Sequence, residues 1–275
     1  MEDNFLLCDE VLFEEEEQEE VLQENGGGDD DDDDDDDPEM NYVRLLIGTE
    51  SDSPGLNDQE VTEMINDNWI QEIRRHAIEY ILGTGQGFGF SHQTVYKSVI
   101  CVDRYLAVRL IEVGGYWKVR LLALTCLSLS AKMDETSGNV PPLSQYPVID
   151  YEINVNDIRR MELLVLDDLN WNMSYVTPFN FTEFFVSRFC RQISTREATR
   201  RRTGEIIMSV LRDLRLMNHR RSVIAAAATL LAVSNNLTTE QLEIEINTLP
   251  LNGLLQIDNV WYCYDRCRQL NNRHI

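Results

Sequence analysis

The amino-acid sequence predicts an all-α fold preceded by a disordered, strongly acidic N-terminal arm. Two observations lead to this prediction. From about residue 67 onward, apolar residues recur at intervals of three and four between residues that cap or break helices. The acidic residues, by contrast, are concentrated at the start of the chain. The 236 residues after position 39 are enough for one long domain or two compact ones.

The acidic arm comes first. Residues 1–39 contain 21 acidic residues and no Lys or Arg, whereas the rest of the chain has 27 acidic and 24 basic residues. The net charge of −24 therefore belongs almost entirely to the arm. Nine consecutive aspartates, Asp29–Asp37, follow Gly26–Gly28. Such a segment repels itself and buries little apolar surface, so we expect residues 1–39 to be disordered.

Five helices are expected in the first half of the folded region, with the third one buried at the centre. The third contains eleven consecutive uncharged residues, Leu121–Ala131, and therefore has no polar face for solvent. Capping and breaking residues set the predicted limits: Asp67 or Asn68 to Leu82, ended by Gly83 and Gly85; a helix capped by Ser91; Tyr116 to Lys132; a short segment opened by Pro141–Pro142; and a helix from Asn154 or Asn156 to Asp168.

The second half repeats this plan around another uncharged stretch, Ser222–Val233. The sequence predicts a helix from Phe179 to Cys190 that is started by Thr177–Pro178, and a basic helix from about Thr195 to Met217. Thr238 or Thr239 and Asp258 are the expected caps of two more helices.

Lys132 and Glu162 are the two charges in unusually apolar helical settings. A charge beside a buried stripe needs a partner or a route to water. Opposite charges on neighbouring helices could mark a docking surface. The structural alternative is that Lys132 stabilises the end of a helix dipole while Glu162 pairs with Arg159, three residues earlier.

Several patterns that suggest chemistry are better explained otherwise, so no catalytic residue, cofactor or metal site is expected. The glycines of Gly83–Gly89 follow a helix without the lysine of a phosphate-binding loop. The four histidines, His76, His92, His219 and His274, are far apart, and Cys263 and Cys267 lack a second ligand pair. Arg200–Arg202 are expected to lie on a solvated helix face, rather than to contact a phosphate or to act as a nuclear import signal. The six cysteines are expected to be reduced thiols. No apolar stretch is long enough to span a membrane, and the acidic start is unlike a signal peptide.

Several segments, in order and with matching spacing across residues 70–190, resemble the cyclin box of plant D-type cyclins. They are Arg75–Leu82 (RHAIEYIL), Phe88–Tyr96 (FGFSHQTVY), Val102–Leu106 (VDRYL), Cys126–Glu135 (CLSLSAKMDE), Arg160–Leu166 (RMELLVL) and Val176–Phe179 (VTPF). The resemblance implies two successive five-helix cyclin-box bundles. The predicted divisions are residues 1–39 as the arm, 40–68 as a linker and N-terminal helix, 69–174 as the N-terminal cyclin box, and 175–275 as the C-terminal cyclin fold.

The resemblance also implies a function. In the family, the residues that match Lys132 and Glu162 bind the regulatory helix of a cyclin-dependent kinase and the loop before it. The chain is therefore expected to be a nuclear and cytoplasmic regulatory subunit, not an enzyme, that activates such a kinase at the G1/S transition. A kinase inhibitor protein is a further implied partner, and neither nucleic acid nor membrane is expected. Two alternatives are an acidic binding protein such as a histone chaperone, and a cyclin-fold transcription regulator that activates no kinase.

The arm carries a second motif, Leu6, Cys8 and Glu10, which fits L-x-C-x-E. In an extended chain these three side chains point the same way. By resemblance to D-type cyclins, the motif is expected to bind a retinoblastoma-type pocket protein.

Two departures from the family alter the expectations. The positions of the substrate-docking patch read Ile73, His76, Ala77 and Tyr80, so docking of Arg-x-Leu substrates is not expected. The chain ends at Ile275 without a tail rich in Pro, Glu, Ser and Thr, so turnover through such a tail is not expected either.

Overall fold

The computed structural model describes residues 38–50, 56–148, 152–251 and 253–272, and all of them belong to one unit, Asp36–Ile275. These residues form α-helices and short 3₁₀ turns, and no strand occurs among them. The predicted all-α fold is therefore confirmed. The acidic run and the motif residues Leu6, Cys8 and Glu10 lie outside the described residues, so the predictions made for them stay predictions.

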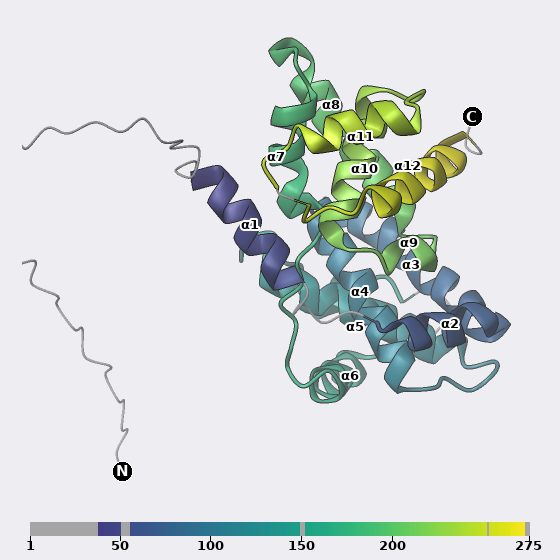
Figure 1. Cartoon of the computed structure of the whole chain (residues 1–275). Helices are drawn as coiled ribbons and strands as arrows, with labels where there is room; N and C mark the ends of the chain where they lie inside the picture. Colours follow the sequence, from purple (N-terminus) through teal and green to yellow (C-terminus); the bar gives the residue numbers. More distant parts are fainter. Residues whose placement is uncertain (1–37, 51–55, 149–151, 252, 273–275) are drawn as a thin grey trace, which may run out of the picture. The chain divides into compact units, whose positions relative to one another are not determined.

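Figure 1 shows the order of the helices along the chain. Their bounds are α1 Pro38–Glu50, α2 Asp58–Asn66, α3 Asn68–Phe88, α4 His92–Val108, α5 Tyr116–Asp134, η2 Leu143–Gln145, α6 Val155–Asp168, α7 Phe179–Phe189, η3 Ile193–Thr195, α8 Arg196–Val210, α9 Leu214–Met217, α10 Arg221–Val233, α11 Thr239–Asn247 and α12 Ile257–Asn272.

The first group of helices packs around α5. This helix contacts α3, α4 and α6, and every residue of Leu121–Ala131 is buried. The stretch needs no polar face because helices surround it, as the sequence predicts. Asn154 begins α6 with a reciprocal capping box to Asp157. The predicted short fourth segment is only one turn of 3₁₀ helix, η2, after Pro142.

The predicted end of the first helix at Leu82 is wrong. Helix α3 continues through the glycines to Phe88, and Gly89, at φ 70°, ends it in the left-handed conformation that glycine adopts freely. Gly85 has a packing role, since a Cβ placed there would come within 2.7 Å of Val95 on α4. The glycine therefore lets the two helices approach closely, and packing outweighs its low helix propensity.

The second group packs around α10, which contacts α7, α8 and α12 and whose residues Ser222–Leu231 are all buried. Three details differ from prediction. The basic helix is divided, because Asp213 caps a separate short helix, α9. Thr177 donates its hydroxyl to Asn180 instead of capping α7. Asp258 lies inside the first turn of α12 and does not cap it.

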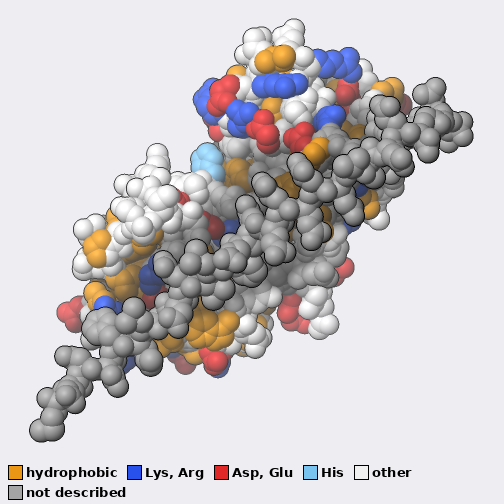
Figure 2. All heavy atoms as spheres, turned by 90° about the vertical axis from the view of Figure 1, so that its left-hand side faces the viewer, with side chains coloured by type: hydrophobic (Ala, Val, Ile, Leu, Met, Phe, Trp, Pro, Cys, Tyr) orange, Lys and Arg blue, Asp and Glu red, His pale blue; other side chains and the backbone are white. Residues whose placement is uncertain are grey.

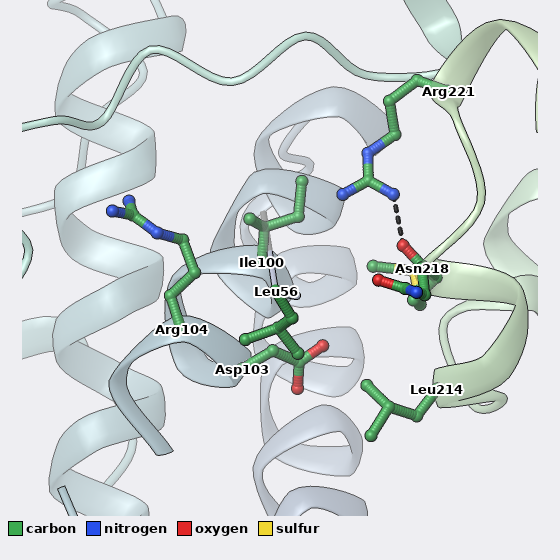
Figure 3. A pocket seen from close by; sticks show the side chains of 8 residues that line it. Leu56, Ile100, Asp103, Arg104, Leu214, Asn218 and Arg221 are labelled. Atoms are coloured by element: carbon green, nitrogen blue, oxygen red, sulfur yellow. Dashed lines mark hydrogen bonds between the residues drawn. The ribbon is translucent and has the colours of Figure 1, made fainter. Parts of the chain in front are cut away.

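A buried ion pair lies where the two helix groups meet. The Arg74 guanidinium on α3 donates two hydrogen bonds to the Asp103 carboxylate on α4, at 2.7 and 2.9 Å. Asp103, Ile100 and Arg104 line one side of a small cavity, opposite Leu214 of α9, in the view of Figure 3. Its volume of about 10 Å³ is close to the smallest cavity that can hold one water molecule. The cavity is therefore a packing gap and not a ligand site.

Helix α1 is attached to the second group through a buried carboxylate at its last residue. Glu50 accepts hydrogen bonds from the backbone N–H of Ser222 at 2.9 Å and from its hydroxyl at 2.5 Å. Arg220 adds an ion pair to the same carboxylate at 2.9 Å. A negative charge at the first turn of α10 is well placed against the helix dipole. Glu50 thus joins the end of α1 to the start of α10.

Candidate functional site

The structure brings Lys132 and Glu162 together. Lys132 lies in the last turn of α5 and Glu162 in the middle of α6, and Lys132 Nζ is 2.6 Å from Glu162 Oε1. The Ser128 hydroxyl donates a second hydrogen bond to the same oxygen, at 2.8 Å. The Lys132 side chain remains 42 % exposed, whereas that of Glu162 is 11 % exposed. The carboxylate is thus held from the inside and the ammonium lies at the surface.

This geometry separates the two interpretations of the charges. Lys132 does lie at the helix end, where a cation stabilises the dipole. Glu162, however, bonds to Lys132 and Ser128 on α5, and no described contact joins it to Arg159. Both bonds use Oε1, and no described donor bonds to Oε2. One carboxylate oxygen and two of the three ammonium N–H groups remain available to a partner.

The end of α5 is fixed to α4, so Lys132 stands on a rigid support. Asp134 pairs with Lys97 at 2.6 Å, and Glu135 accepts hydrogen bonds from the Ser91 backbone N–H and the Thr94 hydroxyl. Burial acts to raise the pKa of Glu135, but the bonds from Thr94 and Ser91 hold this pKa below its usual value. Glu135 is therefore charged at neutral pH, and the contacts of both acids hold the helix end against α4.

Exposed apolar residues directly follow both members of the charged pair in the sequence. Met133, next to Lys132, is 56 % exposed, and Leu163, next to Glu162, is 61 % exposed, with Leu164 also exposed. Figure 2 shows hydrophobic side chains at the surface in the lower half of its face. Exposed aliphatic groups around a partly desolvated charge pair are typical of a protein-binding surface. We call Lys132, Met133, Glu162, Leu163 and Leu164 the α5–α6 surface.

The positions that match the substrate-docking patch are covered. Ile73 and Ala77 are buried, and Arg120 lies over the Tyr80 ring, 4.4 Å from its centroid. The His76 ring packs edge-on against Tyr116, with centroids 5.1 Å apart. These contacts bury or cover the four positions, which agrees with the expectation that Arg-x-Leu substrates do not dock there.

The structure also gives the surroundings of Arg200–Arg202 and of the pair Cys263 and Cys267. Arg200 pairs with Glu183, while Arg201 and Arg202 both pair with Glu205, so these arginines form a solvated helix face. Acidic and basic side chains are accordingly intermixed on the upper part of Figure 2. Burial raises the pKa of Cys267 to about 12, and that of Cys263 is also raised.

The described residues include no candidate metal cluster and no candidate membrane span. No group of three or more His, Cys, Asp or Glu in the described ranges could hold a metal ion. Within the same ranges, no helix is long and apolar enough to cross a bilayer.

Sequence reasoning missed Ser128 and the apolar border of the α5–α6 surface. Ser128 is one turn before Lys132, and this spacing could have indicated a shared partner. Leu163 and Leu164 follow a buried Glu162 directly and so turn away from the core, which helical periodicity could have revealed. The sequence pattern alone does not show which helix faces are covered.

Comparison with known proteins shows which family this site resembles. Residues 50–174, which include both members of the charged pair, match the family described as Cyclin, N-terminal domain. This segment of the chain is therefore similar to the N-terminal domain of cyclins.

Its relatives include D-type cyclins of plants. It is 33% identical to Cyclin-D5-1 of Arabidopsis thaliana over 207 residues, covering 72% of this chain and 64% of that protein. Identity to Cyclin-D5-1 of Oryza sativa subsp. japonica is 36% over 202 residues, covering 72% of this chain and 54% of that protein. The chain thus matches less than two thirds of the length of either relative.

Solved structures share the fold at low sequence identity. A viral cyclin from herpesvirus saimiri aligns with a TM-score of 0.58 and 14% identity, covering 84% of this chain and 96% of that one. A chain of the CAK complex of Chaetomium thermophilum, bound to ATP-gamma-S, aligns with a TM-score of 0.55 and 15% identity, covering 86% and 72%. Both alignments cover more of the chain than residues 50–174, so the shared fold includes part of the second helix group.

Proposed function

We propose that this chain is a regulatory subunit, itself without catalytic activity, that binds and activates a cyclin-dependent kinase. The observation that carries the proposal is the Lys132–Glu162 pair on the α5–α6 surface, inside the segment that matches the cyclin family. The fold it shares with a chain of the CAK complex, solved with bound ATP-gamma-S, supports a kinase partner.

The chemistry of the surface suits a kinase's helix and the loop before it. Glu162 Oε2 would accept backbone N–H groups, and Lys132 would donate to carbonyl oxygens. Leu163, Leu164 and Met133 would bury apolar surface around these polar bonds and exclude water from them. Because Ser128 and α5 already hold the pair in place, binding loses little side-chain entropy.

We further propose action at the G1/S transition and recruitment of a retinoblastoma-type pocket protein through Leu6, Cys8 and Glu10. The sequence pattern of the arm and the D-type relatives support this assignment.

The test is a pull-down of a panel of plant cyclin-dependent kinases by the full chain, followed by a peptide phosphorylation assay. We expect one or more kinases to be retained and activated, and the Lys132→Ala/Glu162→Ala variant to lose both activities. Retention of general transcription factors or promoter DNA without kinase activation would instead support the transcription-regulator alternative. Retention of histones that disappears when residues 1–39 are deleted, with no kinase bound, would support the chaperone alternative.

A further inference from the structure

A groove of about 620 Å³, distinct from the α5–α6 surface, lies between α3 of the first helix group and α9 and α12 of the second. Five arginines line it: Arg74, Arg75, Arg212, Arg215 and Arg266. Ile78 and Leu214 contribute apolar lining. Leu214 also borders the small cavity of Figure 3, on whose far side Asp103 lies. The groove is therefore lined by basic and apolar side chains together with two acids, Glu79 and Asp213.

Three of the arginines are neutralised by acids within the fold. Arg74 pairs with Asp103, Arg75 with Glu79 at 2.9 Å, and Arg266 with Asp213 at 2.7 Å. These pairs explain why the arginines are held in place along the groove. The three ion pairs contribute no net charge to the groove.

Arg212 and Arg215 are different. Both are exposed, and no acidic side chain among the described residues pairs with either of them. They lie on either side of Asp213 and Leu214, just before and within α9. Arg212 and Arg215 thus give the groove two positive charges without a described counter-charge, near the apolar lining residues Ile78 and Leu214.

We infer that this groove binds a phosphorylated peptide segment of a partner protein. Two guanidinium groups that line the same groove match the charge and the oxygens of a phosphate, which a guanidinium group can bind through paired N–H donors. The apolar lining would take a side chain next to the phosphorylated residue, and the volume suits a short peptide segment.

The charge of the rest of the chain favours a compact ligand over an extended polyanion. The whole chain carries a formal charge of −24, and residues 40–275 alone still have 27 acidic against 24 basic residues. The folded region therefore has no net positive charge that would attract a nucleic acid or an anionic membrane over a wide area. A single phosphate on a peptide meets only the local positive charge.

The experiment uses the full chain and three immobilised pools of degenerate nine-residue peptides. The central residue is phosphothreonine in one pool, threonine in the second and glutamate in the third. We expect the phosphothreonine pool to be retained at least about tenfold more strongly than either of the others, because the phosphate presents more charge and more acceptor oxygens. Raising the salt from 0.1 to 1 M should weaken this binding, since the Debye length falls from about 10 to 3 Å.

The Arg212→Ala/Arg215→Ala variant should lose this preference. The matched control is Arg201→Ala/Arg202→Ala, which removes the same charge from α8, outside the groove, and should keep it. Thermal melting of both variants checks the fold, and all four side chains are wholly or partly exposed.

Three results would overturn the inference. They are equal retention of the phosphothreonine and glutamate pools, a phosphate preference that survives in Arg212→Ala/Arg215→Ala, and no preference at all. Binding of phosphatidylserine vesicles that depends on the same two arginines, in the absence of a peptide preference, would assign the groove to a membrane surface instead.

Discussion

Removing either member of the Lys132–Glu162 pair should weaken kinase binding, and the Glu162 variant should lower stability more than the Lys132 variant. The side chain of Lys132 is 42 % exposed, so its ion pair contributes at most about 1 kcal/mol to folding. Glu162→Ala, by contrast, leaves the fully buried Ser128 hydroxyl without its carboxylate acceptor, which costs about 1–3 kcal/mol. Lys132→Ala is therefore the cleaner probe of the interface.

The expected binding loss is larger than the folding loss. A charged residue at the centre of a desolvated interface typically costs about 2 kcal/mol when truncated, or about 30-fold in Kd. Glu162→Lys should lower the affinity further, because it replaces the carboxylate with a second ammonium group beside that of Lys132. Calorimetric titration of the kinase with Lys132→Ala, Glu162→Ala and the double variant gives these values, and melting curves report the folding term.

The chain offers a matched control in Arg109 and Asp168. This pair also joins a base that is 53 % exposed to an acid on α6 that is 8 % exposed, with N–O distances of 2.7 and 2.9 Å. Arg109→Ala removes a comparable ion pair outside the α5–α6 surface and should leave kinase affinity within twofold of the parent. Unchanged affinity and activation in the Lys132→Ala/Glu162→Ala variant would refute the assignment of this surface.

Four further predictions follow from the same structure. Leu163→Ser should weaken kinase binding by about tenfold without changing the melting temperature, because it removes exposed apolar surface only; a parent-like affinity in titration would exclude Leu163 from the interface. Leu124→Asp or Ala226→Asp should unfold the affected helix group, since each buries an unpaired charge; circular dichroism melting would show it, and a parent-like curve would contradict the central placement of α5 or α10. Glu135→Gln should make folding less sensitive to acid. The pKa of Glu135 is lowered in the folded state, so the stabilisation from its carboxylate is present above the unfolded-state pKa and is lost as the pH falls through the folded-state pKa. The melting temperatures of parent and variant should therefore converge between pH 6 and pH 3. Replacing Leu6, Cys8 and Glu10 together should abolish binding to a purified pocket domain and leave kinase binding intact; full-strength binding would make the motif a chance match.

Much of the fold could be predicted because helix caps and uncharged stretches act locally. Ser91 and Asn154 begin helices where expected, and Leu121–Ala131 and Ser222–Leu231 are buried as their lack of charge indicates. The errors occur where tertiary contacts override local preference. Gly85 lies within α3 because that helix packs closely on α4 there. The division of the basic helix has a local cause instead, since the Asp213 side chain caps α9.

The candidate site could be predicted in its residues but not in its connections. The apolar sequence around Lys132 and Glu162 indicates that both are candidates, yet the pattern also allows Glu162 to pair with Arg159 in its own helix. Only the packing of α6 on α5 decides that its partners are Ser128 and Lys132. The basic groove was not predicted at all, because its arginines come from three segments separated by more than 50 residues in the sequence.

The asymmetry of the charged pair explains how one surface can be both stable alone and ready for a partner. An unpaired carboxylate as deeply placed as Glu162 would destabilise the free protein. The bonds from Ser128 and Lys132 to Oε1 remove that cost and leave Oε2 without a described donor. A partner can therefore add hydrogen bonds without first breaking the existing ones. Binding energy then depends on new contacts at Oε2, Lys132 and the flanking leucines, which is why Leu163→Ser and Lys132→Ala should each weaken binding while the fold remains intact.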